Sequence, residues 1–149
     1  MHEGRLPDHV DARVLSAAQL VEALRAYARG IPPVEAAVGL VIEHGRWLTR
    51  EEFLRHVAVR PARHASHALM AVPDWDALCT IADDLEIPHS WAALLTVAVE
   101  LASALDTGWR FQEMVGGLDQ ADTVLVLRAL FHANLGTTAP PLTIVPFSA

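Results

Sequence analysis

The sequence contains no lysine, and its only cysteine is Cys79. Without lysine, Schiff-base chemistry and the phosphate-binding lysine of a P-loop are both excluded. A single cysteine also excludes an intramolecular disulfide, so nothing points to an oxidising compartment. Acidic residues flank Cys79 in the sequence and no basic residue lies near it, which predicts a raised thiol pKa and a poor nucleophile.

Long apolar runs are also missing. The longest runs from Trp91 to Val99, well short of the ~20 residues that a membrane span needs. Residues 1–13 carry charges of both signs and no apolar stretch, so we expect no signal peptide. These features predict a cytoplasmic protein that makes no contact with a membrane.

The charge is distributed unevenly along the chain. Residues 1–70 hold nine arginines and eight acids, whereas residues 71–149 hold two arginines and ten acids, for an overall net charge of −7. An acidic surface repels phosphate backbones, so the second half disfavours nucleic acid as a partner. The same charge would steer a basic protein partner.

The sequence does contain clear signals for where helices start and end. Expected helix starts are Ser16 with Gln19 and Thr49 with Glu52, both at capping-box spacing, and Asp74, Ser90 and Asp119 as single caps. Glycines at 30, 45, 108 and 136 follow expected helix ends. No segment longer than a few residues alternates with a period of two. We therefore predict an all-α fold: a single compact bundle of six or seven helices over residues 1–136, with an extended apolar tail over 137–149.

Three of the expected helices lack an ordinary polar face. They cover residues 34–44, 91–105 and 123–135. A helix that is apolar nearly all round is buried on most sides, and three such helices are many for a chain of 149 residues. Either the bundle is tightly packed, or part of this surface meets a partner or a second copy. The tail adds candidate partner-binding residues, which are Leu142, Ile144, Val145 and Phe147.

The stretch from Arg55 to His67 places three histidines, His56, His64 and His67, among three arginines. Zinc sites take three or four ligands from Cys, His and carboxylates. Only His64 and His67 have regular spacing, no acid lies among them, and the arginines would repel a cation. We interpret the stretch as a basic connecting loop and keep a metal site at the three histidines as the alternative.

Two further constellations could carry chemistry. Arg50 and His56 loosely resemble the Arg-x(4–6)-His pattern of the HEPN ribonucleases, in which the resemblance implies that both residues act from one helix on an RNA phosphodiester. Pairing of Glu51 with Arg55 and of Glu52 with His56 on an exposed helix explains the segment more simply. Glu100, Arg128 and His132 could form either a pocket or one compensated ion pair.

The chain also resembles a group of small, uncharacterised, all-helical actinobacterial proteins. Three short segments carry the resemblance: His44, Gly45, Trp47 and Leu48; Asp74 and Trp75; and Leu118, Asp119, His132 and Ala133. This resemblance implies a lineage and no activity.

Taken together, these features predict a non-catalytic protein–protein interaction or assembly module. We expect it to bind itself through the apolar helices and the tail, and to need no cofactor. The alternative is an enzyme, either a small helical ribonuclease of HEPN type using Arg50 and His56 or a metal-dependent enzyme using the histidine cluster.

Overall fold

A computed structural model describes residues 10–62, 68–84 and 86–136, together with residues 143, 145, 147 and 148. The described chain contains seven α-helices, three short strands and two 3-10 helices. In order, the elements are β1 (Val10–Asp11), η1 (Ala12–Val14), α1 (Ala17–Ala28), α2 (Pro32–His44), η2 (Trp47–Thr49), α3 (Glu51–Leu54), β2 (Val57–Pro61), β3 (Leu69–Pro73), α4 (Trp75–Ile81), α5 (His89–Ala102), α6 (Phe111–Gly117) and α7 (Gln120–Leu135).

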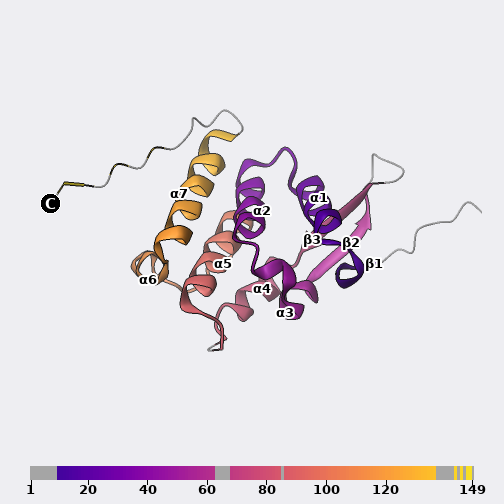
Figure 1. The fold of residues 1–149 in the computed structure, drawn as a ribbon, viewed down its shortest axis with the longest axis horizontal. Helices are drawn as coiled ribbons and strands as arrows, with labels where there is room; N and C mark the ends of the chain where they lie inside the picture. Colours follow the sequence, from indigo (N-terminus) through magenta and orange to yellow (C-terminus); the bar gives the residue numbers. More distant parts are fainter. Residues whose placement is uncertain are drawn as a thin grey trace, which may run out of the picture.

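Helix α2 occupies the middle of the molecule. It packs against α1, α5 and α7, and Figure 1 shows it between α7 on one side and α1 on the other. The sheet lies beyond α1, which packs against β3, while α6 lies at the opposite end of the molecule against α5. The expectation of a mostly helical fold is therefore confirmed.

The core is built from small and branched side chains on α2 and α5. Ala37 and Val41 of α2 and Leu94, Leu95 and Ala98 of α5 are almost completely buried. Small side chains let two helices approach closely, so that their ridges and grooves interlock. Two aromatic residues that follow α2, Trp47 and Phe53, complete the core with ring centroids 6.3 Å apart.

The three-stranded sheet shows that a purely helical fold was too simple a prediction. The strands are antiparallel in the order β1-β2-β3, with Val59 opposite both Val10 and Ala71. Val57 and Val59 point into the core and Ala58 between them is half-buried, which is the period of a strand. The first part of the stretch from Arg55 to His67 is thus an ordered strand, and the prediction of a simple loop is wrong there.

Most of the predicted helix starts are confirmed. The Ser16 hydroxyl accepts from the Gln19 amide while the Gln19 side chain accepts from the Ser16 amide, and Asp74 and Asp119 each cap the helix that follows. The second capping box is wrong, because α3 begins at Glu51 and the Thr49 hydroxyl donates to the carbonyl of Arg46. The helix expected over residues 91–105 ends at Ala102, where Ser103 turns extended.

Among the described residues, none of the helices combines the length and the apolar character needed to cross a lipid bilayer.

Candidate functional site

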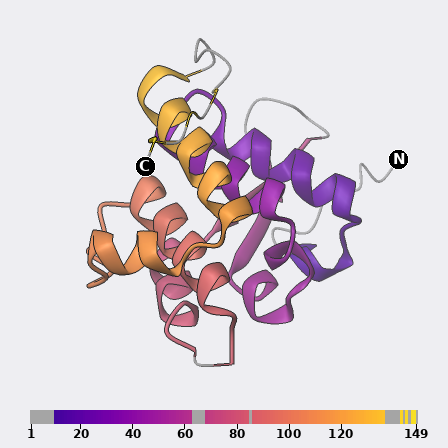
Figure 2. The same ribbon diagram turned by 60° about the vertical axis from the view of Figure 1, so that its left-hand side comes forward.

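Helix α7 is apolar on two opposite faces. Val126 and Ala129 are buried against the rest of the molecule, in keeping with the close packing of α7 on α2. Half a helical turn away, Val124 and Phe131 are 38% and 39% exposed. Figure 2 shows α7 at the front of the molecule, with no other described helix or strand over it. An ordinary surface helix would carry polar residues on this face.

The outward-facing apolar residues of α7 form a continuous row, which we call the outer stripe: Val124, Leu127, Phe131 and Leu135. Their spacings of three, four and four residues place them on one side of the helix. Leu130 lies beside the row and is 41% exposed. Because apolar side chains at this spacing are the usual contact between two helices, the outer stripe is suited to a helical partner.

A second exposed apolar surface lies on α6. Phe111 and Val115 are one helical turn apart and are 73% and 47% exposed, while Met114 between them is buried. Only two residues separate the end of α6 from the start of α7. The last third of the described chain therefore exposes more large apolar side chains than the sheet end does, where Val14 is the main example.

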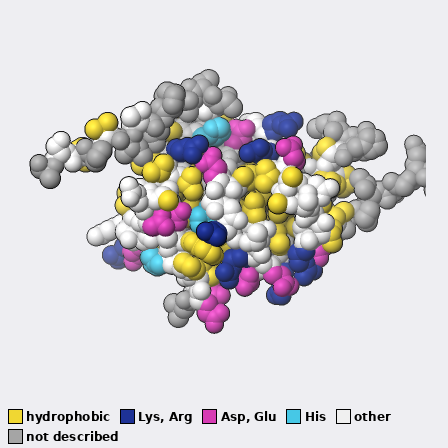
Figure 3. All heavy atoms as spheres, in the orientation of Figure 1, with side chains coloured by type: hydrophobic (Ala, Val, Ile, Leu, Met, Phe, Trp, Pro, Cys, Tyr) yellow, Lys and Arg dark blue, Asp and Glu magenta, His cyan; other side chains and the backbone are white. Residues whose placement is uncertain are grey.

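A groove of ≈ 600 Å³ runs between α1 and α7, with α2 as its floor. The floor is formed by small or aliphatic residues of α2, and the walls contain Ala28 of α1 and Leu125 and Phe131 of α7. A Cβ atom added at Gly39, on the floor, would meet no atom within 4 Å. In Figure 3 basic, acidic and histidine side chains lie together along the upper edge, above α7, α2 and α1.

Two polar contacts join α7 to α2 in this groove. The guanidinium of Arg128 donates to both carboxylate oxygens of Glu43 at 2.8 and 3.2 Å, and His132 Nε2 lies 3.4 Å from Glu35 Oε1. Glu100 is not among the residues of the groove and instead accepts a 2.6 Å hydrogen bond from Thr107. The structure thus brings two of the three predicted pocket residues together, with different carboxylates as their partners.

Two arginines on the α1 wall of the groove lack the carboxylate partners that Arg128 and His132 have. Arg25 and Arg29 are one turn apart, both are exposed, and their side chains form no hydrogen bond or ion pair with any residue that the structure describes. The sequence offered no signal for this pair, because the groove arises only when α1 and α7 flank α2.

A buried polar cluster connects α2, α5 and α7 on the other side of α2. The Ser90 hydroxyl donates to Asp122 Oδ2 at 2.6 Å, and His44 Nε2 lies 3.8 Å from the same oxygen. The side chains of His44 and Asp122 are 5% and 7% exposed. Ser90 lies inside α5, whose N-cap is Pro88, so the predicted capping role of Ser90 is wrong.

The order of contacts in this cluster does not match that of a hydrolytic triad. Ser90 donates to the carboxylate rather than to the histidine, so His44 cannot take a proton from it. Burial lowers the pKa of His44, with Arg46 lowering it further and Asp122 and Asp119 opposing the effect. The Ser90–Asp122 hydrogen bond joins α5 to α7, and the buried His44 of α2 lies beside it; we call these three residues the polar latch.

The predicted ribonuclease pair is not on one helix. Helix α3 consists only of Glu51–Leu54, so Arg50 precedes it and His56 follows it. The Arg50 guanidinium lies 6.0 Å from the Trp91 ring centroid, with Arg46 at 5.9 Å. His56 instead borders a separate depression beside the sheet. The geometry that the HEPN resemblance implies is therefore not formed.

The predicted histidine metal site cannot be placed as a whole. His64 and His67 lie outside the described residues, and only His56 is described. Within the described part of the chain, no three His, Cys, Asp or Glu side chains are grouped so that they could hold a metal ion.

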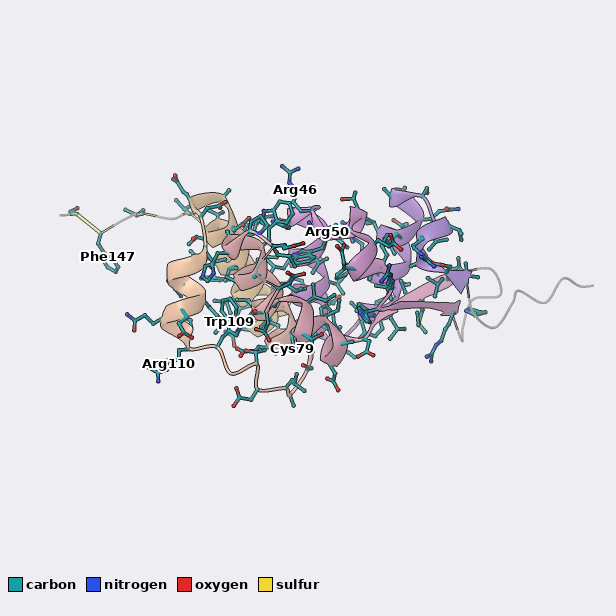
Figure 4. All side chains as sticks on the ribbon, turned by 90° about the horizontal axis from the view of Figure 1, so that it is seen from below. Arg46, Arg50, Cys79, Trp109, Arg110 and Phe147 are labelled. Atoms are coloured by element: carbon teal, nitrogen blue, oxygen red, sulfur yellow. The ribbon has the colours of Figure 1, made fainter. Side chains whose placement is uncertain are left out.

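Cys79 lies on the opposite side of the molecule from Arg46 (Figure 4). Burial raises the pKa of its thiol, and Asp83, Asp76 and Glu100 raise it further. Because the thiolate is the reactive form, this environment disfavours nucleophilic catalysis.

Two of the four predicted tail residues are described. Val145 and Phe147 are 82% and 104% exposed, and Figure 4 shows Phe147 away from the helices. Leu142 and Ile144 lie outside the described residues.

A comparison of the chain with protein-family models, with curated proteins and with solved structures finds no match.

Proposed function

We propose that this protein is a non-catalytic interaction module that associates with a second copy of itself through the outer stripe of α7. The observation that carries the proposal is the second apolar face of α7, opposite the face that packs on α2. Fully burying an aliphatic or aromatic side chain contributes ~1.5–3 kcal/mol, and Val124, Phe131 and Leu135, which are 38%, 39% and 43% exposed, would gain part of this amount in a contact.

The order of residues in the outer stripe favours a second copy as the occupant. When two identical helices pack antiparallel around an axis near Ala129, Leu127 of one copy faces Phe131 of the other, and Val124 faces Leu135. Every large apolar side chain of the row then meets another apolar side chain. Contacts of this kind are isologous, which is the commonest arrangement in homodimers.

Charge does not oppose this contact. The charged side chain nearest the outer stripe, Arg128, is already paired with Glu43 of its own chain. The remaining polar neighbours on this face, Gln120 and Asn134, are neutral. An axis near Ala129 brings the two Arg128 side chains close together, and the Glu43 carboxylate that pairs with each of them offsets their repulsion.

The tail is a second element of the proposed contact. Phe147 and Val145 do not pack against any part of the chain that the structure describes. Apolar side chains exposed to this degree favour a partner surface. We expect the tail to add to the association made by α7.

The test compares the dimer dissociation constants of matched variants by sedimentation equilibrium. Val124→Asp places a charge in the outer stripe near the N-terminus of α7, where an acid is compatible with the helix. Leu127→Gln removes a central contact while keeping good helix propensity. Each is expected to weaken association at least tenfold, and removal of residues 137–149 is expected to weaken it less.

The control is Val14→Asp, which makes the same change at an exposed valine of η1. It is expected to leave the dissociation constant unchanged. Equal behaviour of Val124→Asp and Val14→Asp, with both chains folded by circular dichroism, would contradict the proposed interface.

A further inference from the structure

We infer that the groove between α1 and α7 binds an acidic amphipathic helix of a different protein partner. The groove shares Phe131 with the outer stripe, but Val124 and Leu127 of the stripe do not line it. The proposal rests on the shape of the groove, on its floor and on the charge of its α1 wall.

The groove has the form of a three-helix layer that lacks a fourth helix. Helices α1 and α7 flank α2 without packing closely on each other (Figure 1), and between them Gly39 of α2 stays partly accessible while Ala36 and Leu40 are buried. The volume of ≈ 600 Å³ accommodates a few large apolar side chains. Helix-in-groove recognition uses such anchors on one face of the bound helix, at positions i, i+3 or i+4 and i+7.

The floor is suited to the close approach of a helix. The space above Gly39 is open, and Ala36, one turn before it on α2, is small and buried beneath the groove. Small residues at a contact allow two helix axes to come near the lower end of the usual 8–10 Å separation. Glycine also costs about 1 kcal/mol relative to alanine inside a helix, a cost that close approach of a partner would account for.

The charges in the groove select an acidic partner. On the α7 wall, Arg128 and His132 already have the carboxylates of Glu43 and Glu35 as partners. On the α1 wall, Arg25 and Arg29 have no partner among the described residues. Two carboxylates one turn apart on a bound helix would meet these arginines with charge-assisted hydrogen bonds.

The probes are two synthetic helical peptides of about four turns, built on the same leucine and alanine frame. One carries glutamates beside the leucine face, and the other carries lysines at the same positions. Binding of each labelled peptide to the full chain is measured by fluorescence anisotropy. The glutamate peptide is expected to bind at least tenfold more tightly than the lysine peptide, and Arg25→Gln with Arg29→Gln is expected to remove this preference.

A filled groove provides the decisive variant. In Gly39→Leu the new Cβ atom meets no atom within 4 Å and helix propensity rises, so the chain is expected to fold at least as well as the natural one. It should abolish binding of the glutamate peptide. The matched control, Gly116→Leu, changes a glycine of α6 that also has open space above it and should not alter binding.

Different results would contradict the proposed self-association and the proposed groove binding. Val124→Asp should weaken self-association and leave peptide binding unchanged, because Val124 does not line the groove. Peptide binding that survives Gly39→Leu would overturn the groove as the site. If neither peptide bound, and the natural chain bound dodecyl sulfate while the Gly39→Leu variant did not, the ligand would be an anionic amphiphile and the proposed helix would be overturned.

Discussion

Arg128 of α7 and Glu43 of α2 lie 85 positions apart in the sequence and form a bidentate ion pair, with N–O distances of 2.8 and 3.2 Å. The pair ties α7 to the central helix at the edge of the groove. Both side chains are about half exposed, at 54% and 44%. The packing of Val126 and Ala129 rather than this pair must therefore hold α7 in place.

The first prediction concerns the strength of that pair. A double-mutant cycle with Arg128→Ala and Glu43→Ala is expected to give a coupling free energy of about 0.2–1 kcal/mol, because exposed pairs are screened by solvent. Urea denaturation supplies the four free energies of unfolding. A coupling well above this range would mean that the pair, and not apolar packing, secures α7.

The second prediction concerns the polar latch. Ser90→Ala removes the 2.6 Å hydrogen bond to the buried Asp122 carboxylate. Loss of a partner from a buried polar group costs ~1–3 kcal/mol, and a loss of stability in that range is expected from urea denaturation. Thr80→Ala removes an exposed hydroxyl from α4 and serves as the control, with a much smaller change. Equal changes in the two variants would show that the latch contributes nothing specific.

The third prediction concerns pH. The pKa of His44 in the folded chain lies below its ordinary value of 6.5, because of burial first and Arg46 second, with Asp122 and Asp119 acting in the opposite direction. Below pH 6.5 the unfolded chain therefore binds the proton more strongly than the folded chain does. The contribution of His44 to stability is present above pH 6.5 and is lost as pH falls through the lowered pKa.

The measurement is the free energy of unfolding at pH 7.5 and at pH 5. The natural chain is expected to lose more stability over this interval than His44→Gln does. His56→Gln, which changes a histidine away from the latch, should retain the loss seen in the natural chain. If His44→Gln were as sensitive to acid as the natural chain, His44 would not be the group responsible.

The fourth prediction concerns the direction of the two α7 helices. In a Cys79→Ser background, a chain carrying Val124→Cys and Leu135→Cys together is expected to form an intermolecular disulfide under mild oxidation. Neither single cysteine should form one efficiently, since the antiparallel arrangement separates the two copies of position 124 by about 17 Å along the helix. Efficient linkage by the single Val124→Cys variant would indicate parallel packing instead.

Local signals in the sequence predicted the helices well. The caps at Ser16, Asp74 and Asp119 are side-chain to backbone bonds between close neighbours, so they could be read directly. The sheet was missed because β2 and β3 have only five residues each and alanine occupies Ala58 and Ala71, which leaves little contrast between faces. The alternation of valine and alanine from Val57 to Val59 was the feature of the sequence that could have predicted the strand.

The site could be predicted only in part. The apolar character of residues 123–135 pointed to a helix with more apolar surface than one core covers. Which face of that helix stays exposed depends on α2, a segment far away in the sequence. For the same reason Glu100 was the wrong partner for Arg128: the choice between it and Glu43 is made by helix packing.

Native mass spectrometry of the untagged chain at micromolar concentration tests the central claim most directly. The account predicts a dimer, with twice the 16.2 kDa mass of the chain, that shifts toward monomer on dilution. A species that remains monomeric across the concentration range would contradict self-association through α7.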